Sequence, residues 1–310
     1  MRRAVSVSLG SRRRDRATVL TLLGTPVAVA REGTDGDLAA AGELIARLDA
    51  DPAVQAIGLG GIDRYLQVGG RRYAIRDAEM LAARALHTPV VDGSGLKAVW
   101  EPEVVRRLLQ AGILRTGQRV LMVSAMDRFG MAAAFAELGF AVVYGDLMFA
   151  AGIDYPIRSP GELAELAAKL LPTFTARPFQ ELYPVGREQE RPPDPRFARY
   201  FQEADVIAGD FHYIRRYLPP ALPGRVVVTN TVTEADAALF AERGVAVLVT
   251  TTPVVEGRAF GTNALEAALV AVSGVTPEDP AWPEVVARAG LQCGIRRLVA
   301  PGEGQAERHE

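Results

Sequence analysis

The sequence predicts an α/β protein of two units with parallel sheets, the second a Rossmann-like doubly wound domain. Short apolar runs alternate with helical stretches along the chain, and such alternation produces parallel sheets. Many apolar runs end in a small loop of Gly, Ser, Thr or Asp, and the loops at the carboxyl ends of strands bind ligands in open α/β sheets. The same residue types also serve as ordinary turn and cap residues, so the loops indicate the architecture more than the chemistry.

Composition narrows the class of protein further. A chain of 310 residues, 49% of them hydrophobic, can bury the cores of about two domains. A formal charge of −2 gives no sign of a nucleic-acid partner. The apolar runs are too short to cross a bilayer, and the first, Ala4–Leu9, reads as a strand rather than a signal peptide. We therefore expect a cytoplasmic protein that binds a small molecule, with no membrane partner, and a homo-oligomer is possible.

Residues with reactive side chains are few. Cys293 is the single cysteine and the three histidines lack H-x-x-x-H spacing, so neither a disulfide nor a metal site is expected. Of the 35 basic residues only Lys97 and Lys169 are lysines. A lysine, unlike an arginine, can lose its proton when it is buried. Lys97 lies in a glycine-rich loop and is therefore the stronger candidate for proton transfer.

The first unit is expected over residues 1–111, with a hinge at 111–117. Its helices should begin behind Asp37 and Asp77, and Gly69-Gly70 should close a hairpin. The predicted strands are Ala4–Leu9, Pro26–Arg31, Ala53–Gly58, Tyr65–Val68, Arg71–Ile75 and Pro89–Asp92, and the predicted helices are Asp37–Leu48, Asp77–Leu86 and Glu101–Gln110.

The second unit is expected over residues 118–300, followed by a disordered tail at 301–310. Thr233 and Asp236 have the spacing of a capping box before a helix. The predicted strands are Gln118–Ser124, Phe140–Tyr144, Asp205–Ala208, Arg225–Thr229 and Val245–Thr250, and the predicted helices are Phe129–Leu138, Glu162–Leu171, Glu234–Arg243 and Asn263–Ser273.

Residues 118–146 have the anatomy of a dinucleotide half-site. A strand, a turn, a helix and a second strand lead to Asp146, and an acidic residue at that place binds the ribose 2′-hydroxyl and favours NAD over NADP. The turn from Ser124 to Gly130 lacks the G-x-G-x-x-G pattern, and Asp127 would repel a pyrophosphate unless Arg128 compensates. The candidate cofactor-binding residues are Ser124, Arg128, Gly130, Asp146, Asn230 and Thr231.

The loop Asp92-Gly-Ser-Gly-Leu-Lys97 is the candidate catalytic segment. Lys97 could pair with Asp63 or Asp92, and a lysine beside a carboxylate can move a hydroxyl proton while hydride leaves the same carbon. The alternative is a surface lysine at the start of a helix. The candidate substrate-binding residues are Ser8, Ser11 and Ser94.

Four loops together resemble a known family. They are Ser8-Leu-Gly-Ser11, Gly58-Leu-Gly-Gly-Ile-Asp63, Asp92-Gly-Ser-Gly-Leu-Lys97 and Gly257-Arg-Ala-Phe-Gly-Thr-Asn263. The chain resembles, up to about Gly274, a prokaryotic family labelled quinate 5-dehydrogenase. That label implies kinship with shikimate dehydrogenases: an amino-terminal substrate domain, a carboxy-terminal Rossmann domain, and a Lys–Asp pair at the reacting hydroxyl. The shikimate dehydrogenase motifs S-x-S-x-S-x-x-x-H-N and N-V-T-x-P-x-K do not occur in the chain, so no residue role is carried over from them.

The leading expectation is an NAD(P)-dependent oxidoreductase that acts on a small polyhydroxylated carboxylic acid of the quinate or shikimate type. The cofactor expected is NAD, ahead of NADP. The alternative is a protein of the same architecture that binds another phosphorylated nucleotide or metabolite, as a transferase or as a sensor without catalysis. A third interpretation is an assembly protein, and nothing in the sequence selects it.

Overall fold

A computed structural model describes residues 1–182, 195–230, 232–255, 258–259 and 261–298. The chain forms two compact units, and neither is continuous in sequence. Unit 1 comprises residues 1–100, 165–190 and 261–291, and unit 2 comprises 101–164, 191–260 and 292–310. The division differs from the expected 1–111 and 118–300 because the chain returns to unit 1 twice, at 165–190 and, after the parallel strands of the second sheet, at 261–291. The expected tail at 301–310 lies outside the described residues.

Unit 1 contains a five-stranded sheet in the order β2-β3-β1-β4-β7, in which only β2 is antiparallel to its neighbour. Its elements are β1 (Arg2–Ser8), η1 (Arg12–Arg14), β2 (Arg16–Leu22), β3 (Thr25–Gly33), α1 (Leu38–Asp49), β4 (Ala56–Gly60), β5 (Tyr65–Val68), β6 (Arg71–Ala74), α2 (Arg76–Ala82), β7 (Val90–Val91), the first turns of α3 (Ser94–Gln110), the later turns of α6 (Pro160–Phe174), α7 (Phe179–Leu182), α11 (Thr262–Ser273) and α12 (Trp282–Arg288).

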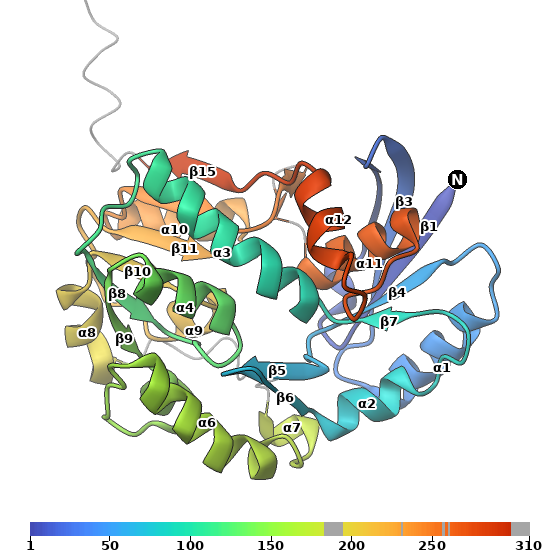
Figure 1. Ribbon diagram of the computed structural model, residues 1–310, viewed down its shortest axis with the longest axis horizontal. Coiled ribbons are helices and arrows are strands. Elements are labelled where there is room, and N and C mark those ends of the chain that lie inside the picture. Colours follow the sequence, from blue (N-terminus) through green and yellow to red (C-terminus); the bar gives the residue numbers. More distant parts are fainter. Residues whose placement is uncertain (183–194, 231, 256–257, 260, 299–310) are drawn as a thin grey trace, which may run out of the picture. The chain divides into compact units, whose positions relative to one another are not determined.

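Helices cover both faces of the unit 1 sheet. Helix α11 crosses β3, β1, β4 and β7 on one face, whereas α1 packs on β1 and on α2 at the other (Figure 1). The strand β1 between them is buried from Ala4 to Ser8, and Ala4, Val5 and Val7 are fully buried. A run buried on both faces is typical of a central parallel strand.

Unit 2 contains a six-stranded sheet in the order β15-β12-β11-β10-β8-β9, parallel except for β15. Its elements are the later turns of α3, β8 (Arg119–Met122), α4 (Phe129–Glu137), β9 (Ala141–Tyr144), α5 (Asp146–Ala151), the start of α6, η3 (Pro195–Phe197), α8 (Ala198–Glu203), β10 (Val206–Ala208), α9 (Phe211–Arg216), β11 (Val226–Thr229), α10 (Glu234–Glu242), β12 (Val247–Thr250), β13 (Val254–Val255), β14 (Arg258–Ala259) and β15 (Gly294–Arg297).

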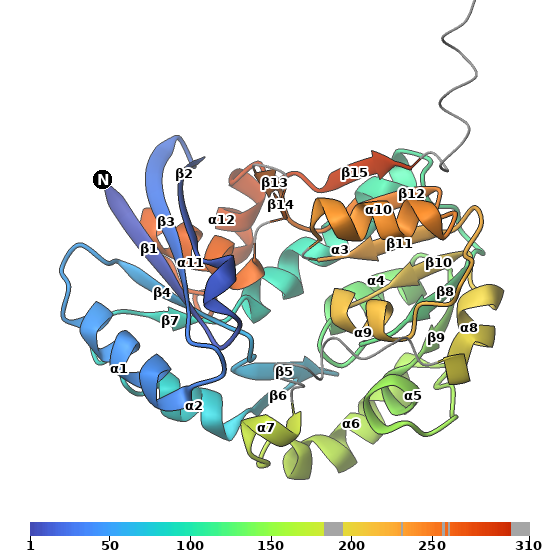
Figure 2. The ribbon, with the colours of Figure 1, turned by 180° about the vertical axis from the view of Figure 1, so that it is seen from behind.

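The unit 2 sheet is doubly wound, as the sequence predicts. Helix α4 lies on one face of the sheet (Figure 1), and α9 and α10 lie on the other (Figure 2). The core on the α9 and α10 face is aromatic: Phe149 makes edge contacts with Phe197 and Phe201 at centroid distances of 5.6 and 5.7 Å. The parallel strands follow the order 2-1-3-4-5 of flavodoxin-like doubly wound sheets.

Several local predictions are confirmed. Asp37 caps α1 through the amide of Ala40, and Thr233 and Asp236 form the capping box of α10. The strands β5 and β6 form the predicted hairpin.

Two local predictions are wrong. No strand is predicted between Ala4–Leu9 and Pro26–Arg31, but the residues there form the edge strand β2, along which exposed and partly buried residues alternate. Asp77 does not cap α2, since its carboxylate accepts a hydrogen bond from the amide of Phe179, and Ile75 is the residue before the helix.

None of the helices among the described residues has both the length and the apolar character needed to cross a membrane.

Candidate functional site

The topology marks one place in each sheet where a ligand site is expected. In unit 2 the winding reverses between β8 and β10, and in unit 1 it reverses between β1 and β4. Open α/β sheets bind ligands at this reversal, beyond the carboxyl ends of the strands. The predicted site residues follow these strands or their neighbours, so each unit has its own candidate region.

In unit 1 the structure pairs Lys97 with Asp63. Lys97 lies in the first turn of α3, and Asp63 lies three residues beyond the end of β4. The Lys97 ammonium donates a hydrogen bond to Asp63 Oδ1 at 2.7 Å, and only 9% of the lysine side chain and 19% of the aspartate side chain are exposed. The alternative of a surface lysine is therefore wrong. A nearly buried ammonium on a carboxylate can hold or transfer a proton.

Asp92, the other predicted partner of Lys97, instead organises the surrounding loops. Its Oδ2 accepts hydrogen bonds from the backbone amides of Arg64 (2.5 Å) and Tyr65 (3.2 Å). Its Oδ1 accepts from the amide and the hydroxyl of Ser94 at 3.0 and 2.6 Å. Four donors satisfy this buried carboxylate, and the predicted substrate-binding hydroxyl of Ser94 is directed to it. These bonds point to a structural role for both residues.

The glycines of the same loop allow α11 and Pro277 to pack closely against the loop, and they leave no room there for a ligand. At Gly93, whose φ is +92°, a Cβ would lie 2.8 Å from the amide nitrogen of Asn263 in α11. At Gly95 a Cβ would lie 2.3 Å from Cβ of Pro277. These glycines therefore do not form a cradle in which the backbone folds around a small ligand, because protein atoms fill that space.

Sequence reasoning missed a buried carboxylate beside Lys97. Glu266 in α11 is 0% exposed, and it accepts hydrogen bonds from the amides of Gly93 (2.8 Å) and Leu96. Burial, followed by the charge of Asp92, raises the pKa of Glu266 to about 8, although the two amides and Lys97 act in the opposite direction. The available signal was that Glu266 is the single charged residue of α11, a helix otherwise built of apolar and small polar residues.

The predicted serines at the end of β1 are occupied by protein donors. Ser8 Oγ accepts hydrogen bonds from the amide of Gly10 at 3.1 Å and from the Arg31 guanidinium at 2.9 Å. Ser11 Oγ accepts from the amide of Arg13 at 3.3 Å and begins η1. Neither hydroxyl is therefore arranged in a way that indicates substrate binding.

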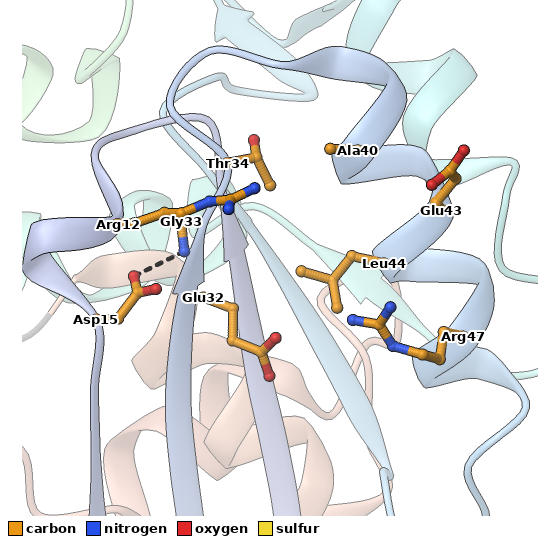
Figure 3. A pocket seen from close by; sticks show the side chains of 9 residues that line it. All are labelled: Arg12, Asp15, Glu32, Gly33, Thr34, Ala40, Glu43, Leu44 and Arg47. Atoms are coloured by element: carbon orange, nitrogen blue, oxygen red, sulfur yellow. Dashed lines mark hydrogen bonds between the residues drawn. The ribbon is translucent and has the colours of Figure 1, made fainter.

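A pocket of about 360 Å³ adjoins these loops at the end of β3 (Figure 3). Arg12 in η1 and Arg47 in α1 line it together with Glu32 near the end of β3. The described residues that line it are Arg12, Asp15, Glu32, Gly33, Thr34, Ala40, Glu43, Leu44 and Arg47. Two of its charges are matched by neighbours, because Arg12 pairs with Asp35 and Asp15 pairs with Arg31.

In unit 2 the structure brings together the polar residues that follow three neighbouring strands. Ser124 Oγ, beyond β8, accepts a hydrogen bond at 2.9 Å from the amide of Asp210, beyond β10. Asn230, beyond β11, donates to Asp210 Oδ2 at 2.9 Å. Asp210 also caps α9 through the amide of His212. The predicted residue Thr231 lies outside the described residues.

Arg128 is directed into this cluster and is only 2% exposed. Its guanidinium pairs with Glu101 on α3, with Asp127 at 3.5 Å and with Asp210 at 4.0 Å. Three carboxylates therefore surround the arginine that was expected to offset Asp127 at a pyrophosphate. Gly130, also predicted to bind the cofactor, is the second residue of α4.

Asp146, which is partly buried, closes the turn after β8 through two hydrogen bonds. Its carboxylate accepts hydrogen bonds from the amides of Ala125 at 3.2 Å and Met126 at 2.8 Å. Loss of hydration raises the pKa of Asp146 to about 6, against the lowering effect of those amides. Dinucleotide folds direct the amides of this turn at the pyrophosphate. Because a carboxylate already occupies them, the turn does not fit the pyrophosphate of a dinucleotide.

Tyr213, on α9, adds an aromatic hydroxyl to the unit 2 cluster. Burial and then the charges of Asp210, Asp127 and Asp146 raise the pKa of this hydroxyl. It therefore stays protonated and can donate a hydrogen bond at this end of the sheet. Within the described ranges no group of three or more His, Cys, Asp and Glu side chains is arranged to hold a metal ion.

Comparison of the sequence with protein families gives two adjacent matches. A domain of unknown function, DUF8754, matches residues 95–298. The chain belongs to the DUF8754 family. A second domain of unknown function, DUF8753, matches residues 3–92. The DUF8754 segment includes α11, which packs on the unit 1 sheet, so the two sequence families do not coincide with the two structural units. A comparison with curated proteins gave no match.

Solved structures with a similar arrangement include enzymes and a binding protein. Glutamate dehydrogenase from Thermus thermophilus is 13% identical with a TM-score of 0.43, over 93% of this chain and 73% of the other. The glucose-galactose binding protein GanP from Geobacillus stearothermophilus is 9% identical with a TM-score of 0.39, over 96% and 97%. The bifunctional methylenetetrahydrofolate dehydrogenase/cyclohydrolase FolD from Campylobacter jejuni is 13% identical with a TM-score of 0.30, over 93% and 84%.

Proposed function

We propose that the protein is an oxidoreductase that acts on a small polyhydroxylated carboxylic acid of the quinate or shikimate type. The observation that carries the proposal is the Lys97–Asp63 pair, 2.7 Å long and largely withdrawn from solvent. The resemblance to the family labelled quinate 5-dehydrogenase supports it independently, because that resemblance implies a Lys–Asp pair at the reacting hydroxyl.

The pair suits the proton half of such a reaction. Oxidation of a secondary alcohol to a ketone removes the hydroxyl proton and a hydride. In this proposal the Lys97 amine accepts the proton, and in the reverse direction the ammonium returns it to the carbonyl oxygen. Asp63 orients the Lys97 side chain and stabilises the ammonium form, so the two residues act as a unit.

The proposed hydride acceptor is NAD, with NADP second. The strand order of unit 2, shared with nucleotide-binding folds, supports a nucleotide. The turn closed by Asp146 does not fit a pyrophosphate, so no residue from Ser124 to Gly130 is given a phosphate-binding role. Lys97 and Asp63 are therefore given roles toward the substrate only, and none toward the nucleotide.

The test is a spectrophotometric assay of nicotinamide reduction with quinate or shikimate as substrate. Lys97→Arg keeps a cation on Asp63 but removes a group that can lose its proton. We expect it to lower kcat by about 10²–10⁴-fold, the usual contribution of a positioned acid or base. Lys169→Arg is the matched control, since Lys169 is exposed on α6 and should leave kcat unchanged. Equal turnover in the two variants, or none in the wild type, would reject the proposal.

A second candidate function is binding of another phosphorylated nucleotide or metabolite, as a transferase or a sensor. The closed turn at Asp146 favours it over NAD, and the cluster of Ser124, Asp210 and Asn230 supplies polar groups at the reversal of the sheet. Thermal shifts with NAD⁺, NADP⁺, ATP and S-adenosylmethionine separate the candidates. A ligand at a hundred times its Kd stabilises by about 2.7 kcal/mol. A shift with ATP, and none with either nicotinamide nucleotide or with S-adenosylmethionine, which carries no phosphate, would favour the second candidate.

A further inference from the structure

Glu266 carries a buried carboxyl group with a defined set of contacts, and the proposed reaction gives it no part. Both of its carboxylate oxygens accept backbone amides at the start of α3: Oε1 from Gly93 at 2.8 Å and Oε2 from Leu96. The side chain is 0% exposed. The first amides of a helix have no partner within the helix, so an outside acceptor fixes their position.

The start of α3 is thus held by two carboxylates from outside the helix. Glu266 binds Gly93 and Leu96, and Asp92 binds Ser94, so acidic side chains accept three of the four backbone amides from Gly93 to Leu96. Lys97 comes immediately after Leu96, and its own amide donates to the Gly93 carbonyl at 2.9 Å. Two contacts therefore fix the backbone at Lys97. One is the bond from the preceding amide, of Leu96, to Glu266, and the other is the bond from the Lys97 amide to Gly93.

Close packing prevents Glu266 from swinging away. A Cβ at Gly95 would lie 3.1 Å from Glu266 Oε2 and 2.3 Å from Cβ of Pro277. The start of α3 therefore approaches Glu266 and Pro277 as closely as a glycine permits. At the start of α11 the Asn263 amide donates to the Ser6 hydroxyl at 2.6 Å. Helix α11 is therefore held on the unit 1 sheet by this hydrogen bond as well as by the packing of its apolar face.

We infer that Glu266 is a positioning residue, which fixes the first turn of α3 and thereby holds the Lys97 ammonium on Asp63. For turnover, the inference rests on the proposed role of Lys97 in proton transfer. For the geometry of the lysine, it stands on the contacts of Glu266 alone. The inference predicts that loss of the Glu266 carboxylate disturbs Lys97 without disturbing a lysine elsewhere.

The composition makes this measurable, because Lys97 and Lys169 are the only lysines in the chain. Labelling with ¹³C,¹⁵N-lysine gives two side-chain Nζ signals, and Lys97→Arg assigns them. Glu266→Gln keeps the shape of the side chain but turns an amide group toward a backbone donor, so one of the two bonds is lost. We expect the Lys97 Nζ signal to move or broaden in Glu266→Gln, with the Lys169 signal unchanged.

Leu269→Val is the matched control for general destabilisation. Leu269 lies one helical turn beyond Glu266 in α11 and is fully buried, but it has no polar group. This variant should lower Tm and leave both lysine signals in place. A fall in Tm in Glu266→Gln with the Lys97 signal unmoved would show a packing role only and would overturn the inference.

The wild-type protein provides a second test if Glu266→Gln does not fold. The charged groups around the carboxyl group are Asp92 and Lys97, with Asp63 on the lysine, while the Arg64 guanidinium pairs with Glu79. Titration of Glu266 should appear as an inflection in the Lys97 Nζ shift near pH 8 and be absent from the Lys169 shift. A Lys97 signal without that inflection would also overturn the inference.

Kinetics separate this inference from the proposed function. With an active wild type, Glu266→Gln should lower kcat by roughly 10- to 100-fold, the cost of a misplaced catalytic group, and leave KM nearly unchanged. If the wild type turns over no hydroxy acid, the proposed function fails, and the lysine signals still decide whether Glu266 positions Lys97.

Discussion

Glu101 and Arg128 form an ion pair in which the side chains are only 1% and 2% exposed. Withdrawing one partner would leave the other charge buried in unit 2, and such a loss typically costs about 3–5 kcal/mol. We therefore expect Arg128→Met to lower the free energy of unfolding by about that amount in urea denaturation. The double variant Glu101→Leu/Arg128→Met should recover much of the loss, because neither charge then remains. Additive losses would contradict this account.

Asp146 should make stability depend on pH in the direction opposite to that of most aspartates. Its pKa in the folded chain is about 6, above the ordinary value of 3.8, so between these values the folded chain binds the proton more tightly. The stabilisation is complete below about pH 4 and is lost as pH rises through 6. A shift of this size corresponds to at most about 3 kcal/mol.

The measurement for Asp146 is the free energy of unfolding from pH 4 to 8 in the wild type and in Asp146→Asn. The difference between the two proteins should change in favour of the variant as pH rises through 6. Parallel curves would mean that the Asp146 carboxyl group does not titrate in this range.

Gly95 distinguishes packing from ligand binding in the loop before Lys97. Gly95→Ala would place a Cβ 2.3 Å from Pro277, and such overpacking costs about 1–3 kcal/mol. Gly161→Ala is the control, because no atom lies within 4 Å of the added Cβ in the first turn of α6. It should be neutral or slightly stabilising. A Gly95→Ala protein with normal stability and impaired ligand binding would restore the interpretation of a ligand cradle.

Lys97→Ala should abolish turnover and leave the affinity for the nucleotide nearly intact. The expectation follows from the placement of Lys97 in unit 1, on Asp63, where the proposed substrate would be held. Nucleotide affinity is measured by calorimetry and turnover by the reduction assay. An equal loss of both would place Lys97 in the nucleotide site instead.

The sequence predicts those features that depend on neighbouring residues. The capping box of Thr233 and Asp236, the hairpin closed by Gly69-Gly70 and the parallel sheets follow from local spacing. The edge strand β2 was missed although four of its seven residues are apolar, because Val19 and Leu20 are adjacent and interrupt the strict alternation of a half-buried strand.

The positions of the candidate site residues can be predicted from the sequence, and the directions of their side chains less so. Loops at the ends of parallel strands meet, and this is why Lys97 and Asp63 come together as expected. The direction of a side chain depends on tertiary contacts. Asp146 occupies the predicted place, yet its carboxylate is directed to Ala125 and Met126, and Glu266 comes from a helix about 170 positions beyond the residues it binds.

The late return of the chain to unit 1 also sets an order of events during synthesis. The face of β4 that carries Gly58 and Gly60 is covered by Asn263 and the rest of α11. When the first hundred residues have left the ribosome, that glycine-lined face is still bare, and the helix that covers it has not been translated. Unit 2, whose parallel strands β8 to β12 all precede α11, has most of its sheet available before unit 1 has its last layer. The amino-terminal sheet is therefore made first and finished last, and a nascent chain stalled before α11 would expose a face prone to association.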